Sequence, residues 1–246
     1  AIRPQGTETM APFEKTQLGS MIDRVCSRPR PAGNDPDHRA ARRAAWTELV
    51  RPMGRRHAEC TIDNYRIETD GQRAVVSALR EYAGHILDEV AAGNGIVLFG
   101  PSGVGKDHLL TAMARVAILD HGLTVAWCNG MDLYGELRDR IHNDKPEAEW
   151  VGRMVSPDIL YMSDPIPPRG GLTAYQAVMM QRILDRRNRK MRPVWTSLNV
   201  RSGAEADELM GAALVDRLKH GAMTAFCDWP SYRKARAVWP KKGSTT

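Results

Sequence analysis

The hydrophobic and polar positions of this chain form short apolar runs separated by longer stretches with helical spacing. The apolar runs, each bounded by glycine, proline or polar residues, cover 96–99, 124–129, 159–162, 193–199 and 223–229. Short continuous runs of this kind predict buried strands. Strands that alternate with helices predict an α/β fold, a five-stranded parallel sheet flanked by helices, whose ligands bind at the carboxyl ends of the strands.

Helical spacing predicts helices between and ahead of the strands. We expect a short helix over about 17–26, a basic helix over 37–51 and single helices over about 71–92, 132–141, 174–191 and 207–219. In the 132–141 helix, Ile141 should face inward and Arg140 outward. In the 174–191 helix, Tyr175 and Val178 should pack inward, and the carboxyl end is strongly basic.

A glycine-rich turn joins the first apolar run to a predicted helix. Its sequence, Gly100-Pro101-Ser102-Gly103-Val104-Gly105-Lys106-Asp107, fits the phosphate-loop pattern G-x-x-x-x-G-K-[ST] except at the last position. In such a loop, backbone N–H groups and the helix N-terminus face an anion, and the lysine reaches the outer phosphates. We therefore predict a nucleotide site that is formed by Pro101, Ser102, Gly103, Val104, Gly105, Lys106, Asp107 and His108.

Asp107 of the loop and residues at three other places complete this predicted site. Asp107 stands where a serine or threonine normally offers a hydroxyl to Mg²⁺. The third apolar run ends in Ser163 and Asp164, and an acid after four apolar residues is typical of the second phosphate-site element. Asn199 ends the fourth run, beside the expected γ-phosphate. Tyr65, just ahead of the first strand, is a candidate for covering the nucleotide base, with packing in the core as the alternative.

Charge and composition limit the classes of partner. The formal net charge is +6, and residues 1–56 hold eleven Lys and Arg against six acids, a net of +5. This balance favours a polyanionic partner such as nucleic acid, although a basic protein without one stays an alternative. The four cysteines form no C-x-x-C pair, and no apolar run approaches the ~20 residues of a membrane span. We therefore expect a cytoplasmic protein with no zinc module and no membrane contact.

With these motifs placed, residues from about 60 to 236 resemble the DnaC/IstB-like branch of the AAA+ ATPases, the branch of bacterial and phage replicative helicase loaders. The matching segments are 61–65 with Gln72, the phosphate loop, 183–187, 192–193, 198–199, 215–218 and 228–233. The resemblance implies an AAA+ domain over 59–236 without a C-terminal helical lid. We expect residues 1–58 to be a partly flexible basic arm that docks a partner, or alternatively a tail with a packing helix, and 237–246 to be a basic tail.

The resemblance also implies roles for individual residues. Lys106 would bind the β- and γ-phosphates, and Asn199 would position the attacking water. Arg217 would be the arginine finger offered to the nucleotide of a neighbouring subunit, which implies a homo-oligomer; a salt bridge on its own helix is the alternative. Arg233 would contact the γ-phosphate.

Two positions depart from the family pattern, and the departures are reciprocal. Asp107 is an acid where the family has a hydroxyl, and Ser163 is a hydroxyl where the family has an acid. Counted from Asp158 without a gap, Ser163 stands at the family's position for the metal-associated acid. Asp164 then stands at the position of the catalytic acid. We therefore predict that Asp107 ligates Mg²⁺, that Ser163 orients a metal-bound water and that Asp164 polarises the attacking water. In the alternative registration Asp164 is the metal-associated acid and Pro165 replaces the catalytic one, which predicts ATP binding with little hydrolysis.

Together these features predict an ATP-dependent accessory ATPase of DNA replication. It would oligomerise on ATP, bind single-stranded DNA and engage a replicative helicase, with ATP and Mg²⁺ as cofactors. One alternative is a transposition ATPase that recruits a transposase to duplex DNA. Another is a nucleotide-gated scaffold with little turnover.

Overall fold

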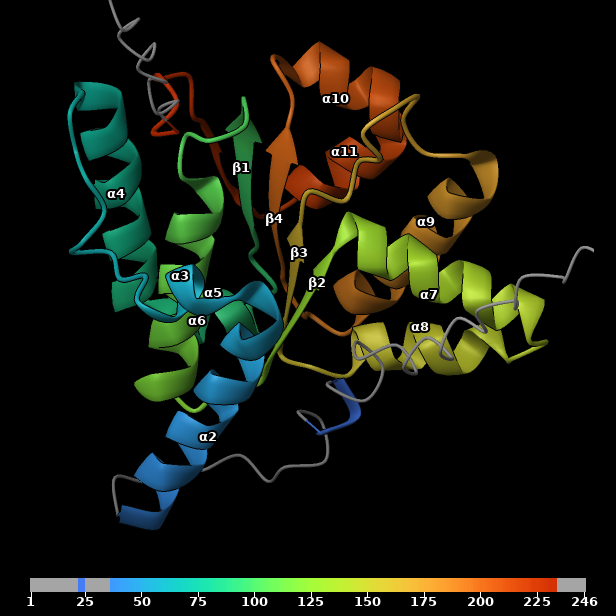
Figure 1. The fold of residues 1–246 in the computed structure, drawn as a ribbon, viewed down its shortest axis with the longest axis horizontal. Coiled ribbons are helices and arrows are strands. Elements are labelled where there is room, and N and C mark those ends of the chain that lie inside the picture. Colours follow the sequence, from blue (N-terminus) through green and yellow to red (C-terminus); the bar gives the residue numbers. More distant parts are fainter. Residues whose placement is uncertain (1–21, 25–35, 234–246) are drawn as a thin grey trace, which may run out of the picture.

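The computed structural model describes residues 22–24 and 36–233 and has one parallel sheet at its centre. Its order is β2-β3-β4-β1-β5, which confirms the predicted five-stranded parallel α/β fold (Figure 1). The strands are β1 (Ile96–Gly100), β2 (Val125–Asn129), β3 (Ile159–Ser163), β4 (Val194–Asn199) and β5 (Met223–Phe226).

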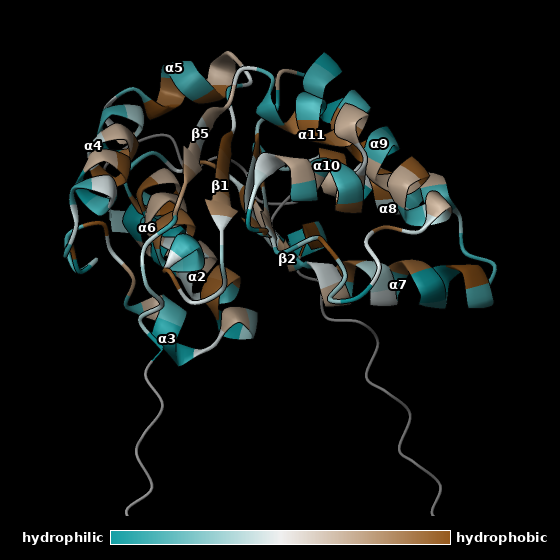
Figure 2. Ribbon diagram, turned by 90° about the horizontal axis from the view of Figure 1, so that it is seen from above, coloured by the Kyte–Doolittle hydropathy of each residue, from teal (hydrophilic) through white to brown (hydrophobic). Residues whose placement is uncertain are grey.

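Helices cover both faces of this sheet. The helices α2, α4 and α6 lie on one face, and α9, α10 and α11 lie on the other (Figures 1 and 2). Apart from the three residues 22–24, which are also helical, the helices of the described chain are α2 (Pro36–Met53), α3 (Arg55–Ala58), α4 (Asp70–Gly84), α5 (Ile86–Ala91), α6 (Lys106–Leu119), α7 (Gly130–His142), α8 (Glu147–Val155), α9 (Ala174–Arg189), α10 (Gly203–Met210) and α11 (Ala212–Lys219).

The hydrophobic core lies between the sheet and these helices. All five residues of β1 and of β3 are buried, as expected for central strands of a parallel sheet. The helices alternate between the two colours in Figure 2, and α4 buries Val75, Leu79 and Tyr82, so it turns an apolar stripe toward the core. At the edge, β5 is only partly buried, and Phe226 is exposed.

Two predicted single helices are each broken into two. The 71–92 stretch breaks at His85, because Gly84 is a poor helix former and the turn lets Ile86 of α5 reach the core. The 207–219 stretch belongs to α10 and α11, which meet at Gly211. Its backbone has φ of 93°, a left-handed conformation that glycine adopts without strain.

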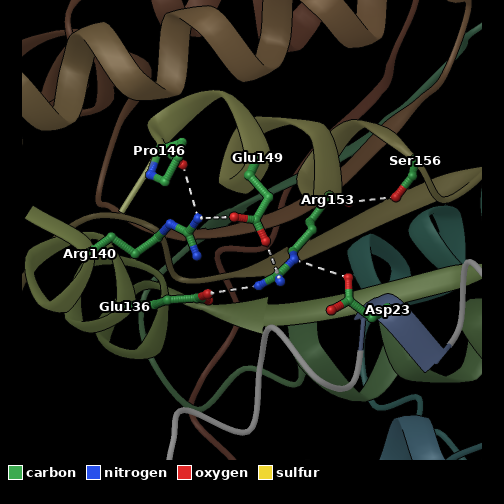
Figure 3. Close-up of polar contacts among 7 residues, drawn as sticks. All are labelled: Asp23, Glu136, Arg140, Pro146, Glu149, Arg153 and Ser156. Carbon is green, nitrogen blue, oxygen red and sulfur yellow. Dashed lines mark hydrogen bonds and ion pairs between the residues drawn. The ribbon is translucent and has the colours of Figure 1, made fainter. Parts of the chain in front are cut away.

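The sequence patterns misplaced several side chains around α7 and α9. Ile141 is 56% exposed rather than buried, and Arg140 is buried, where it donates to Glu149 of α8 at 2.8 Å (Figure 3). The helix α8 was not predicted, and its packing against α7 changes which face of α7 is covered. On α9, Val178 is 56% exposed, and Tyr175 is also exposed, where its hydroxyl donates to Glu147 at the start of α8.

The predicted helix over 37–51 is confirmed as α2. Trp46, Leu49 and Val50 are buried, and Arg42 donates to the carbonyl oxygens of Leu119 and Asp120 at the end of α6. The helix is thereby fastened to the sheet domain, while the partner-docking arm over 1–58 and its boundary stay predictions. Of the expected 17–26 helix only Ile22–Arg24 is described, and it is helical; the rest and the tail over 237–246 lie outside the described residues. None of the described helices is long and apolar enough to cross a membrane.

Candidate nucleotide site

The glycine-rich turn lies at the carboxyl edge of the sheet, between β1 and α6. Gly103 and Gly105 have φ of 87° and 90°, values that a residue with a side chain rarely adopts. A Cβ on Gly105 would lie 2.7 Å from the ring of Tyr65, and one on Gly103 would collide with the hydroxyl of Ser231. Both glycines are therefore required by backbone conformation and by close packing around the loop.

Two distant segments hold this loop from outside. The carbonyl oxygen of Val104 accepts hydrogen bonds from the Tyr65 hydroxyl at 2.9 Å and from Trp229 Nε1 at 2.8 Å. The backbone N–H of Tyr232 donates to Gly103 at 2.9 Å, and its hydroxyl accepts from Gln72 at 2.7 Å. The 61–65 segment with Gln72 and the 228–233 segment thus fix the conformation of the phosphate loop.

Three other predicted site residues lie around this loop. Tyr65 is 5% exposed and stands edge-on to His108, with ring centroids 5.3 Å apart. His108 Nε2 lies 3.0 Å from the carbonyl oxygen of Thr61. Arg233 is exposed, and its Cδ lies 3.3 Å from the position that a Cβ on Gly103 would take. The contacts of Tyr65, His108 and Arg233 with a nucleotide stay predictions.

Lys106 is held in place by three acceptors. Its Nζ donates to the carbonyl oxygens of Gly100 at 2.7 Å and Pro101 at 2.8 Å, and to Asn199 Oδ1 at 2.8 Å. The side chain is buried, and this burial lowers the pKa of the ammonium group against the opposing effect of Asp107. Since three bonds use all three N–H groups, a phosphate must replace at least one of these acceptors.

Asn199 links Lys106 to Asp164. Its Nδ2 donates to Asp164 Oδ2 at 2.6 Å, while its Oδ1 accepts from the lysine. Asp164 has φ of 47°, and its backbone N–H donates to the carbonyl oxygen of Ser197 at 3.0 Å. Burial raises the pKa of the Asp164 carboxyl, and the hydrogen bonds from Asn199 oppose that shift.

Asp107 faces a second group of polar side chains. Its Oδ1 accepts hydrogen bonds from Ser197 Oγ at 2.6 Å and Ser163 Oγ at 3.0 Å, and lies 3.3 Å from the Tyr161 hydroxyl. Ser163 and Ser197 are paired across β3 and β4. Carboxylate and hydroxyl oxygens are the hard donors that suit Mg²⁺, so this group fits the metal.

Ser197 and Tyr161 were not among the predicted site residues. The signal for them was the period of two along a strand, which places residues i and i+2 on the same face. Ser197 precedes Asn199 by two residues, and Tyr161 precedes Ser163 by two. That rule, applied backward from each predicted residue, would have found both.

Arg217 lies at the opposite edge of the sheet. It lines a small hollow with Gly95 before β1 and Val194 at the start of β4. A strand of five residues is about 16 Å long at about 3.3 Å per residue, so Arg217 is far from the phosphate loop of its own chain. Its Nη1 is paired with the carboxylate of Asp185 on α9, and not with a residue of its own helix.

The chain is similar in sequence to known proteins. The family model for IstB-like ATP binding proteins matches residues 37–238. The chain is 28% identical over 185 residues to the replicative helicase loader DnaC of Escherichia coli K12, which covers 75% of this chain and 72% of that protein.

Solved structures show the same fold. A crystal structure of the DnaC helicase loader superposes with a TM-score of 0.63 at 16% identity, covering 70% of this chain and 99% of that one. AMPPCP-bound DnaA from Aquifex aeolicus gives 0.56 at 18% identity, covering 69% and 50%. The fold is thus the AAA+ type that was predicted, and between β5 and Arg233, where the described chain stops, no helix forms a lid.

Proposed function

Because this chain belongs to the family of IstB-like ATP binding proteins, we propose that it hydrolyses ATP as a Mg²⁺-dependent accessory ATPase of DNA replication. The observation that carries the ATPase proposal is the meeting of Lys106, Asn199 and Asp164 beside Asp107 and Ser163 at one edge of the sheet. The similarity to replicative helicase loaders supports the replication role.

The phosphate loop and Lys106 bind the phosphates of ATP in this proposal. The loop is held in one conformation before the nucleotide arrives, so little entropy is lost when its N–H groups meet the phosphates. Asp107, with Ser163 and Ser197 beside it, holds Mg²⁺, which supplies charge neutralisation on the phosphates when it is bound. Asp107 and Ser163 are in contact, which supports the hypothesis that they have exchanged a hydroxyl and a carboxylate beside one metal. It speaks against the alternative registration, in which Pro165 replaces the catalytic acid.

Asp164 and Asn199 act on the attacking water. Asn199 donates to Asp164 and accepts from Lys106, so it places the carboxylate beside the lysine that meets the outer phosphates. The burial that raises the pKa of Asp164 makes its ionised form a better proton acceptor. Turnover should therefore be lost as the pH falls through this raised pKa, above the ordinary 3.8 of an aspartate.

Replacing Asp164 by asparagine tests these roles. Asp164→Asn should lower ATP turnover about 10²-fold, the usual contribution of a general base, and leave nucleotide affinity within a few fold. Ser163→Ala should instead weaken the Mg²⁺ dependence of binding, because it removes a hydroxyl beside Asp107. Turnover with radiolabelled ATP and binding of a fluorescent ATP analogue, each across a Mg²⁺ titration, separate the two effects.

The opposite pattern would contradict this assignment. If Asp164→Asn abolishes Mg²⁺-dependent binding while Ser163→Ala changes nothing, Asp164 is the metal-associated acid. The position of the catalytic acid then belongs to Pro165, and the protein is a nucleotide-gated scaffold with little turnover.

The proposed partners are single-stranded DNA and a replicative helicase, and the basic arm over 1–58 engages the helicase in the cytoplasm. Arg217 reaches the nucleotide of a neighbouring subunit, so ATP joins the copies of a homo-oligomer. The match to a family named for IstB favours a second candidate, a transposition ATPase that recruits a transposase to duplex DNA. A preference for single-stranded or duplex DNA separates these two functions.

A further inference from the structure

A hollow of about 330 Å³ lies between α8 and α9, away from the nucleotide site. Its lining consists of Gly152 and Val155 of α8 and the basic residues Arg186, Arg189 and Lys190 at the end of α9. These two helices lie side by side, and their carboxyl ends precede β3 and β4 (Figure 1). The hollow is therefore at the edge of the sheet opposite the phosphate loop.

The three basic side chains of this hollow are not neutralised within the described part of the chain. Arg186, Arg189 and Lys190 form no ion pair there, whereas Arg182, earlier on α9, pairs with Glu147 at 2.5 Å. Arg189 and Lys190 are exposed. The hollow thus concentrates positive charge at the surface.

Neighbouring arginines of the same basic segment have structural roles instead. Arg187 is fully buried and donates to the carbonyl oxygens of Met154, Pro157, Asp158 and Pro193. Arg192 donates to the carbonyl oxygens of Val155 and Ser156. Packing thus accounts for Arg187 and Arg192, but not for the three cations of the hollow.

Cations in the last turn of a helix also interact favourably with its dipole, which explains part of this charge. The dipole does not explain why a glycine, Gly152, occupies the position of α8 that lines the same hollow. Gly152 is in the middle of a helix, where glycine costs about 1 kcal/mol relative to alanine. A Cβ built on it meets no atom within 4 Å, so the glycine keeps the wall of the hollow clear.

We propose that this hollow binds the phosphate groups of a DNA strand. This proposal rests on the proposed function, in which DNA is a partner. It places the DNA contact at the edge of the sheet opposite the nucleotide site. Lysine and arginine contacts to the phosphate backbone position a protein on nucleic acid without reading sequence. A protein segment would need an apolar centre for its interface, and Val155 is the one large apolar side chain of the lining.

The test is the salt dependence of DNA binding by the full chain. Each lost phosphate contact lowers the slope of log K against log salt by about 0.7 for single strands and about 0.9 for duplex. The double variant Arg189→Gln/Lys190→Gln should therefore lower the single-strand slope by about 1.4 and weaken binding about tenfold at 0.15 M salt. Fluorescence anisotropy with a labelled oligothymidine and with a matching duplex measures both quantities.

Two further variants control for charge and for folding. Arg73→Gln/Arg80→Gln removes the same charge from exposed positions on α4, which covers the other face of the sheet, and should leave the slope unchanged. Gly152→Leu fills the hollow without changing charge, and it should weaken DNA binding several fold. Equal melting temperatures of the variants and the wild type show that the loss is not caused by unfolding.

The outcomes separate this inference from the proposed function. If the wild type binds neither form of DNA, the DNA partner itself is wrong. If the wild type binds and Arg189→Gln/Lys190→Gln binds equally well with the same slope, DNA lies elsewhere and the hollow is wrongly assigned. If the double variant keeps its DNA binding but loses ATP-dependent self-association or helicase binding, the hollow is a protein interface and the proposal is overturned.

Discussion

Arg217→Ala is expected to lower ATP turnover about 10³-fold while leaving ATP affinity within a few fold. An arginine finger acts on charge that develops on the transferred phosphoryl group, so its loss affects the transition state rather than binding. Arg217 lies at the sheet edge opposite the phosphate loop of its own chain, beside Gly95 and Val194. In its proposed role it would therefore act on the nucleotide of another copy. Steady-state turnover and equilibrium binding of a fluorescent ATP analogue measure the two quantities.

Mixing two inactive variants tests whether the finger acts between subunits. Arg217→Ala keeps its phosphate loop, and Lys106→Ala keeps its finger. In a random equimolar assembly with head-to-tail interfaces, roughly a quarter of the interfaces combine the intact parts. The mixture should recover a measurable share of turnover, although each variant alone has almost none.

The ion pair with Asp185 provides the matched control for Arg217. If the arginine has only a structural role in this pair, Asp185→Ala should lower turnover and stability as much as Arg217→Ala does. We expect Asp185→Ala to keep most of its turnover, because the guanidinium remains. Equal losses in both variants, with no recovery in the mixture, would contradict a finger that acts between subunits.

The second large effect concerns the exchanged hydroxyl and carboxylate. Asp107→Ser should lower turnover about 10³-fold, because it removes the carboxylate that holds Mg²⁺ in the proposed site, and such a metal contributes several kcal/mol. Ser163→Asp alone should also impair turnover, since it places a second carboxylate beside Asp107, where the serine hydroxyl lies 3.0 Å away. The double variant Asp107→Ser/Ser163→Asp restores the usual family pattern and should recover most of the activity.

This double-mutant cycle measures the coupling directly. Residues that share one ligand typically show interaction energies of about 0.5–3 kcal/mol, and we expect a value near the upper limit. Turnover and the Mg²⁺ concentration for half-maximal turnover are measured for the wild type and the three variants. Additive losses, with a double variant worse than either single one, would show that the two positions do not serve one metal.

The strands and the phosphate loop were predictable because each depends on local sequence. Buried strands need continuous apolar runs, and the loop needs glycine where φ is positive, as at Gly103 and Gly105. Asn199 and Asp164 were predictable because they end strands of a parallel sheet, and such ends meet at one edge. Their contact at 2.6 Å follows from the order of β3 and β4.

The features that were not predicted depend on contacts between distant elements. Arg187 looks like part of an exposed basic run, but carbonyl oxygens from two separate segments, 154–158 and Pro193, surround it. Arg140 looks like an outward residue of α7 until α8 covers it with Glu149. Helical spacing describes one helix at a time, so it does not reveal which face a neighbouring helix will cover.

We propose that this chain hydrolyses ATP and that DNA controls the rate of hydrolysis. The most direct measurement is ATP turnover by the purified wild type in Mg²⁺, alone and with saturating single-stranded or duplex DNA. We expect turnover that single strands stimulate more than duplex does, and stimulation by duplex alone would favour the transposition ATPase instead. Tight ATP binding without turnover under any of these conditions would contradict the claim.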